Sequence, residues 1–298
     1  MDMDDSSGSG GFIASAIDLY LQAKAERDGP KPTVLGYGMR ASGSGGCARQ
    51  SALSAAGVPD CHVPSGASGV AMHQGNSGHE LMQEALAYVL DDFEAEVPVV
   101  LTHLGFTVSG SADGVATMGC RRHPSGQSRV VYEAKYKGGF GFKLARENGP
   151  ERKEVVQAAI YALGLGIRRV MIFYCARETS YRDKITAGES MEWTFYLDDL
   201  FGDTGQTLEQ LAYDELHRMQ AIWEQVQGNL IPARNVPGHG LVDVPPKYGA
   251  KKGQPWNCRY CRVRDYCAEL PSGQVPVAEA PLVVRESWLA DAPLEAAS

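Results

Sequence analysis

The chain has 298 residues, of which 44% are hydrophobic and 21% charged, and its formal net charge is −8. This composition is ordinary for a soluble globular protein, and no apolar run reaches the roughly 18–20 residues that a membrane span requires, so a membrane protein is excluded and a cytoplasmic location is expected. Residues 12–270 carry a net charge of only −2, because residues 1–11 and 271–298 each contribute −3. The net charge of the chain therefore does not exclude a nucleic-acid partner.

In chain order, residues 1–11 are rich in Gly, Ser and Asp and are expected to be disordered, as is the tail 271–298. The stretch between them, 12–270, is expected to form one domain. Helical periodicity predicts helices over 12–26, 47–57, 75–93, 139–147, 151–165 and 204–227. Short strands are predicted within 94–118, broken at Gly105 and at "GSADG" (110–114), and further strands over 128–138, 168–176 and 191–198. This order predicts an α/β fold with a mixed central β-sheet flanked by helices.

The helix predicted over 75–93 has an apolar stripe at helical spacing, made of Leu81, Met82, Ala85, Leu86, Val89 and Leu90. His79 precedes two of these residues by three and seven positions, which puts it on the buried stripe. Such a histidine is either a hydrogen-bonded core residue or a metal ligand.

Two acidic residues lie in or beside predicted strands. Because side chains alternate along a strand, Glu133 and Lys135 share one face of "VVYEAKY" with Val131. Asp113 lies in "GSADG", at the junction of two predicted strands. If Asp113 and Glu133 converge, two carboxylates face one cavity, which is what Mg²⁺ or Mn²⁺ requires, and Lys135 lies next to the ion. The simpler alternatives are a surface ion pair and a turn-forming aspartate.

The helix predicted over 151–165 carries Gln157 and Tyr161 four residues apart, on adjacent turns. This pair could orient the lysine, contact DNA, or only pack and cap a buried face.

Three of the seven cysteines, Cys258, Cys261 and Cys267, form a C-x2-C-x5-C pattern. An odd number of cysteines with no secretory signal favours a metal site or free thiols over disulfides. The spacing suits a tetrahedral thiolate site that lacks one ligand, and from the spacing alone structural zinc is the usual occupant.

Five features in order resemble the RecB-like branch of the PD-(D/E)XK nuclease superfamily. They are G-x3-H-E at Gly75, His79 and Glu80, G-x2-D at Gly110 and Asp113, E-x-K at Glu133 and Lys135, Q-x3-Y at Gln157 and Tyr161, and the cysteine pattern preceded by distant Cys47. With Cys47 the chain is similar to the iron–sulfur subset, which includes the CRISPR-associated RecB-like exonucleases and their phage homologues. The resemblance covers about residues 47–267.

The resemblance implies a restriction-endonuclease-like core whose iron–sulfur region joins the N- and C-terminal segments. It implies that His79, Asp113, Glu133 and the carbonyl of Ala134 hold a divalent cation and that Lys135 is the catalytic lysine. Gln157 and Tyr161 would lie near the active site and the DNA path. Cys47, Cys258, Cys261 and Cys267 would ligate a structural [4Fe–4S] cluster, with zinc as the alternative.

We therefore expect a metal-dependent DNA exonuclease that acts on single strands or frayed ends, in the cytoplasm of the host cell if the gene is phage-encoded. One alternative is a non-catalytic DNA-end-binding subunit with recombination, repair or CRISPR-adaptation proteins as partners. Another is a zinc-stapled scaffold protein. No membrane partner is expected.

Overall fold

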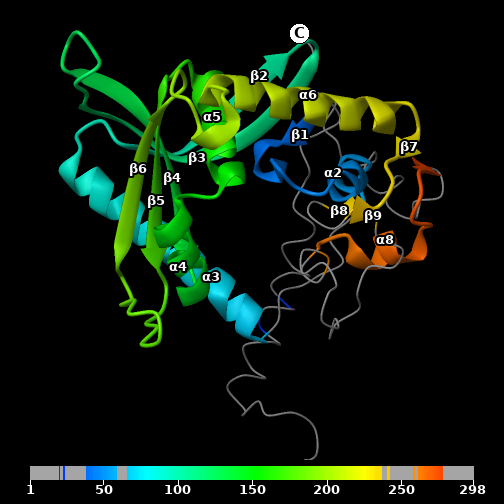
Figure 1. The fold of residues 1–298 in the computed structure, drawn as a ribbon, viewed down its shortest axis with the longest axis horizontal. Helices are drawn as coiled ribbons and strands as arrows, with labels where there is room; N and C mark the ends of the chain where they lie inside the picture. The colour runs from blue at the N-terminus through cyan, green and yellow to red at the C-terminus, as the bar shows by residue number, and fades with distance from the viewer. Residues whose placement is uncertain are drawn as a thin grey trace, which may run out of the picture.

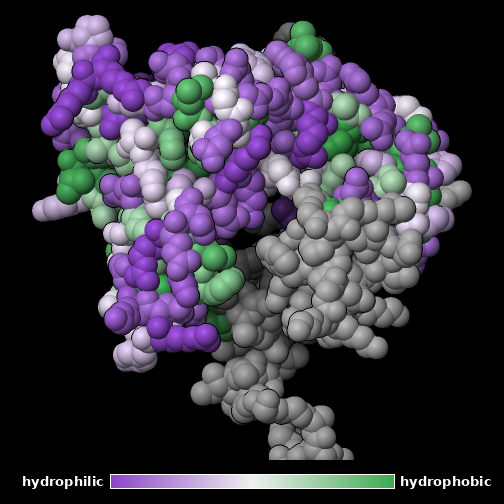
Figure 2. Space-filling view, viewed as in Figure 1, coloured by the Kyte–Doolittle hydropathy of each residue, from purple (hydrophilic) through white to green (hydrophobic). Residues whose placement is uncertain are grey.

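The computed structural model describes residues 38–58, 66–236, 240–241, 258 and 261–277, together with residues 20 and 23. The expected disordered start 1–11, most of the helix expected over 12–26, and residues 278–298 lie outside the described residues. A central sheet with helices on both faces occupies one side of the molecule in Figure 1, and a smaller helical region with short strands occupies the other. Hydrophilic residues dominate the described part of the face in Figure 2.

Six strands form the sheet, in the order β1-β3-β4-β5-β6, with β2 also paired to β3. They are β1 (Gly38–Arg40), β2 (Glu94–His103), β3 (Phe106–Gly119), β4 (Gln127–Lys137), β5 (Arg169–Ala176) and β6 (Ser190–Tyr196). The pairs β1–β3 and β4–β5 are parallel and the other pairs are antiparallel. The prediction of a mixed central sheet flanked by helices is therefore confirmed.

Helices lie on both faces of this sheet. The principal ones are α3 (Gly66–Val89), α4 (Gly139–Asn148), α5 (Arg152–Leu165) and α6 (Leu208–Gln227). On β4, Tyr136 donates a hydrogen bond to α3, whereas Glu133 accepts one from α5. Because side chains three residues apart on a strand point to opposite faces, α3 and α5 cover opposite faces, and α6 packs on α5. Within the described residues, no helix is long and apolar enough to cross a membrane.

The remaining elements are short. They are the 3-10 helices η1 (Ala41–Gly43) and η2 (Gly202–Thr204), the helices α2 (Ala48–Ala55) and α8 (Arg264–Glu269), and the strands β7 (Leu230–Ile231), β8 (Asn235–Val236), β9 (Gly240–Leu241) and β10 (Val275–Pro276). Strand β10 pairs with β7, and β8 pairs with β9.

Helix α3 differs from its prediction in two ways. It begins at Gly66 rather than near residue 75, because its interior glycines are tolerated; at Gly78 a Cβ atom would lie 2.4 Å from the Tyr136 ring, so the ring needs a glycine there. The predicted apolar stripe is also too wide. Met82 is buried, but Leu81 and Val89 are each 66% exposed, because only one side of the helix rests on the sheet. Ala85 is also exposed.

The predicted break at residues 110–114 is wrong, because β3 runs through them as one strand. What changes there is the pairing partner of the strand. One edge of β3 pairs with β2 over nearly the whole of β2. The other edge pairs with β1 as far as Ser109 and with β4 only from Gly114 onward. In the described sheet, residues 110–113 therefore have no ladder partner on that edge. Tyr161 of α5 packs there against Gly110, where a Cβ atom would lie 2.6 Å from the tyrosine ring.

The chain belongs to the fold at least as far as Val277, so the domain boundary predicted at residue 270 is too early. Val275 and Val277 are buried, and Val275 pairs with Ile231. The buried side chain of Arg49, on α2, donates hydrogen bonds of 2.7–3.1 Å to the carbonyls of residues 271–273. Arg234, also buried, donates to the carbonyls of residues 267 and 270. Two arginines thus fix this segment to the body of the molecule.

Replacing Arg49 by methionine should lower the free energy of unfolding by about 2–4 kcal/mol, because three backbone carbonyls lose their donor. Urea unfolding measures the change. The matched control is Arg121→Met, in an exposed turn, which should change the free energy by less than about 0.5 kcal/mol. Equal effects of the two substitutions would show that Arg49 does not fix the segment after residue 270 to the body of the molecule.

Replacing Gly110 by alanine should cost about 1–3 kcal/mol, because the new methyl group overlaps the Tyr161 ring. Gly119, on the same strand, has no atom within 4 Å of a Cβ position, so Gly119→Ala is the control and should be neutral or slightly stabilising. Chemical unfolding of both variants checks this. An unchanged Gly110→Ala protein would show that Tyr161 does not pack closely on β3.

Candidate active site

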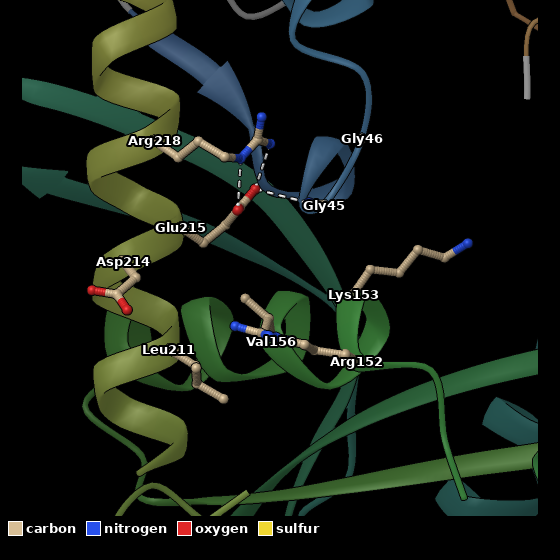
Figure 3. Close-up of a pocket in the computed structure, with 9 residues that line it drawn as sticks. All are labelled: Gly45, Gly46, Arg152, Lys153, Val156, Leu211, Asp214, Glu215 and Arg218. Carbon is tan, nitrogen blue, oxygen red and sulfur yellow. Dashed lines mark hydrogen bonds and ion pairs between the residues drawn. The ribbon is translucent and has the colours of Figure 1, made fainter. Parts of the chain in front are cut away.

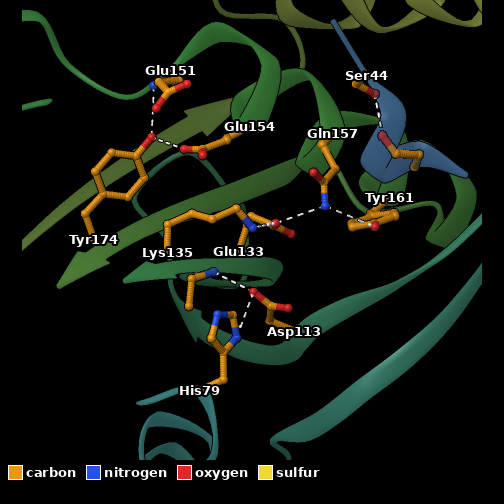
Figure 4. Close-up of polar contacts among 12 residues, drawn as sticks. Ser44, His79, Asp113, Glu133, Lys135, Glu151, Glu154, Gln157, Tyr161 and Tyr174 are labelled. Carbon is orange, nitrogen blue, oxygen red and sulfur yellow. Dashed lines mark hydrogen bonds and ion pairs between the residues drawn. The ribbon is translucent and has the colours of Figure 1, made fainter. Parts of the chain in front are cut away.

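Glu133 is at the centre of the polar residues on the α5 face of the sheet. Its side chain is 1% exposed, and its Oε1 atom contacts the Lys135 ammonium group from the same strand. Gln157 donates from Nε2 to this oxygen at 3.0 Å and to the Tyr161 hydroxyl at 3.1 Å, so it lies between the two groups (Figure 4). The strand alternation and the helical spacing of four residues that predicted these pairs are both confirmed.

Asp113 lies where β3 and β4 separate. Its Oδ2 atom accepts a hydrogen bond from the Ala134 backbone amide at 2.7 Å, so the carboxylate is a side-chain partner for β4 beyond the end of the ladder. The same oxygen lies 3.5 Å from Nδ1 of His79 on α3. The His79 ring packs against Tyr136, with centroids 5.6 Å apart. His79 is 26% exposed rather than on the buried stripe, because it faces this opening in the sheet.

The structure thus brings together the side chains of all six sequence-predicted residues around this opening, from β3, β4, α3 and α5 (Figure 4). The contact of Ala134 is made by its amide group; the expected role of its carbonyl stays a prediction. The roles of the six side chains in catalysis and DNA binding also stay predictions.

Burial dominates the electrostatics of this cluster. It raises the pKa of Glu133 to about 8, against the opposing effect of Lys135, and it also raises the pKa of Asp113. Burial disfavours the Lys135 ammonium, but the charges of Glu133 and Asp113 outweigh this effect and raise its pKa. Lys135 is therefore protonated at neutral pH. Burial likewise raises the pKa of Tyr161 to about 12, so its hydroxyl keeps its proton.

The donor set fits a hard divalent cation in its chemistry. The carboxyl groups of buried Glu133 and partly buried Asp113 have raised pKa values, and an added positive charge would stabilise both as carboxylates. The second oxygen of Glu133, Oε2, is buried and has no hydrogen-bond partner among the described residues. As the side chains stand, however, no three histidine, cysteine, aspartate or glutamate residues in the described ranges are grouped closely enough to hold one ion. Lys135 contacts Glu133 and would balance its charge once the carboxyl group is ionised.

A second polar cluster, which the sequence analysis missed, continues along α5. Lys137 lies on the same face of β4 as Glu133 and Lys135, and its ammonium contacts Glu151 at 2.8 Å and buried Glu154 at 2.7 Å. The Tyr174 hydroxyl of β5 donates to Glu154 and accepts from the Glu151 backbone amide (Figure 4). Glu154 precedes Gln157 by one helical turn, and this spacing in the sequence could have placed Glu154 on the same face of α5 as Gln157.

A cavity of about 480 Å³ lies on the other side of α5, between its first turn, the glycine loop at residues 45–46, and α6 (Figure 3). Arg152, Lys153 and Arg218 line it, but Arg218 donates twice to the Glu215 carboxylate, at 2.7 and 2.8 Å. Glu215 also accepts the Gly45 amide at 2.9 Å. The acidic side chain therefore ties the loop to α6 and offsets one of the three positive charges.

The four cysteines expected to act as ligands lie near one another, around α2 and α8. Burial, followed by the charge of neighbouring thiols, raises the pKa of Cys258 to about 11; burial is likewise the main cause that raises the pKa of Cys261 to about 12. The charges of Cys47 and Cys267 contribute to both shifts. Arg234 donates from Nε to Cys267 Sγ at 3.2 Å. None of the described cysteines forms a disulfide.

The chain matches no protein-family model and no curated protein. Among solved structures it is similar to SSO0001, with a TM-score of 0.45 and 13% identity over 87% of this chain and 98% of that chain. It is also similar to LHK-Exo in complex with dAMP, with a TM-score of 0.39 and 12% identity over 64% of this chain and 88% of the other. A third similar structure is an alkaline exonuclease (LHK-Exo) from Laribacter hongkongensis, with a TM-score of 0.32 and 12% identity over 53% of this chain and 69% of that chain. Likeness at this level assigns no activity to the chain.

Proposed function

We propose that this chain is a divalent-metal-dependent deoxyribonuclease that removes nucleotides from single-stranded or frayed DNA ends. The observation that carries the proposal is the opening between β3 and β4, where Asp113, buried Glu133 and protonated Lys135 meet. Two acids and a cation that face one opening suit the hydrolysis of a phosphodiester, because charge develops on the phosphoryl oxygens. The preference for DNA ends is drawn from the sequence resemblance.

Asp113, Glu133, His79 and the Ala134 carbonyl would hold Mg²⁺ or Mn²⁺, since oxygen donors suit these hard cations. A bound cation of this kind stabilises charge on the phosphate and lowers the pKa of a coordinated water.

The chain's own groups have separate tasks. Lys135, which stays charged at neutral pH, would bind a non-bridging phosphate oxygen and stabilise negative charge as the bond breaks. Gln157 fixes the Glu133 carboxylate through the 3.0 Å hydrogen bond, and Tyr161 in turn holds Gln157. Precise orientation of the acid matters because small displacements of reacting groups cost large factors in rate.

We also propose that Cys47, Cys258, Cys261 and Cys267 hold a [4Fe–4S] cluster with a structural role, in place of zinc. All four lie in the described residues, and Cys47 and Cys267 both act on the pKa values of Cys258 and Cys261, so the thiols are neighbours. The choice of the cluster over zinc is drawn from the sequence resemblance.

Replacing Lys135 by methionine, or Glu133 by glutamine, should reduce DNA cleavage at least about a hundredfold, because each removes charge from the reacting centre while nearly preserving its volume. The measurement is cleavage of end-labelled single-stranded and duplex DNA with Mg²⁺, with Mn²⁺ and with EDTA.

The matched control is Lys143→Met, on α4, whose lysine pairs with Asp183 away from the site. It should cleave at the parent rate. Undiminished cleavage by both the Lys135 and Glu133 variants would disprove the assignment. A folded parent protein that binds DNA ends without cutting them would instead identify a non-catalytic end-binding subunit, for example of a recombination, repair or CRISPR-adaptation complex.

Protein purified without oxygen should be brown and contain about four iron atoms per chain. Cys47→Ser or Cys267→Ser should lower the iron content and the unfolding midpoint, because the centre links distant parts of the chain. Cys175→Ser, on β5 and outside the group, is the control and should keep the iron. A colourless protein with about one zinc per chain would point to the zinc-stapled alternative.

A further inference from the structure

Two histidines from distant parts of the chain meet on the surface, apart from both sites described above. His103 is the last residue of β2, and His217 lies on α6. Their Nε2 atoms are 3.2 Å apart, and their ring centroids are 5.2 Å apart. His217 is exposed and His103 is half-buried, so solvent reaches the pair.

The distances are those of two imidazoles on one tetrahedral ion. With zinc–nitrogen bonds of about 2.0–2.1 Å, two ligating nitrogens lie about 3.3 Å apart and the ring centroids about 5.2 Å apart. In the structure the same two nitrogens are within hydrogen-bond distance of each other. The observed centroid distance of 5.2 Å is compatible with rings that converge on one ion.

The pair is also held in position by rigid elements. His103 is in the last ladder pair of the β2–β3 hairpin, opposite Phe106. Its ring packs on Tyr213, one turn before His217 on α6, with centroids 5.1 Å apart. Tyr213 in turn packs against the main hydrophobic core. Ligands fixed by a strand and a helix lose little freedom on binding, which favours affinity.

We propose that His103 and His217 form a surface binding site for a tetrahedral divalent transition-metal ion, with Zn²⁺ as the best fit. Imidazole nitrogen suits zinc, copper and nickel rather than Mg²⁺. The described residues bring no third histidine, cysteine or carboxylate to the pair, so the other two coordination positions are open to water or to a ligand from solution. The bound ion would cross-link the end of β2 to α6. This site is independent of the proposed nuclease function.

The test is a Zn²⁺ titration of the full chain, observed through the side-chain nitrogen resonances of its histidines. The Nε2 resonances of His103 and His217 should shift together and saturate together. His103→Gln and His217→Gln should each weaken binding at this site about tenfold or more, and the loss in the double variant should be smaller than the two single losses combined, because the two ligands act as a chelate. His123→Gln removes another exposed histidine and should bind like the parent.

A second measurement is the rise in unfolding midpoint on adding zinc. Binding to the native state raises the midpoint in the parent and in His123→Gln, and most of the part due to this site should be lost in the His103 and His217 variants. Zinc bound to cysteines would contribute equally to all four proteins and cancel in the comparison. If His217→Gln leaves the His103 shift and the midpoint rise unchanged, the proposal is wrong.

Discussion

The separation of β3 from β4 is the constraint on which the candidate site depends. Because β2 pairs with the other edge of β3 on both sides of Asp113, the sheet stays continuous while one edge opens over residues 110–113. The opening exposes backbone groups that would be costly to leave without partners in a core. Asp113 meets this need by accepting the Ala134 amide, so the residue that completes the sheet is also one of the two site acids.

Helix α5 transmits this constraint to the rest of the cluster. Glu154, Gln157 and Tyr161 lie at successive turns, and they contact Lys137, Glu133 and the Gly110 backbone in turn. A shift of the helix by one residue would break all three contacts together. The buried Lys137–Glu154–Tyr174 contacts therefore belong to the support of the site, although they lie about one helical turn beyond it. These contacts fix the position of α5, and α5 in turn positions the Gln157 side-chain amide, which donates a hydrogen bond to Glu133.

The sequence predicted what depends on local geometry. Strand alternation was enough to pair Glu133 with Lys135, and helical spacing was enough to pair Gln157 with Tyr161, because in each case the chain itself sets the separation. Asp113 and His79 were candidates from their own segments, but only the order of motifs joined them in one site, since their approach depends on the packing of α3 over the opening. The exposure of Leu81 and the start of α3 were missed because they are decided by what the helix rests on. The His103–His217 contact joins residues 114 positions apart and has no local signal.

The buried arginines near the cysteines pose a question of charge. Arg49 and Arg234 are almost inaccessible to solvent, and buried cations are tolerated only when polar or negative groups surround them. Backbone carbonyls supply part of this surrounding, and the contact from Arg234 to Cys267 supplies a sulfur atom. A centre with four thiolates carries a net charge of about −2 whether it holds Zn²⁺ or an oxidised four-iron cluster, so the two arginines balance either one. With the proposed centre in place, charge would account for the two buried arginines equally well for zinc and for a four-iron cluster.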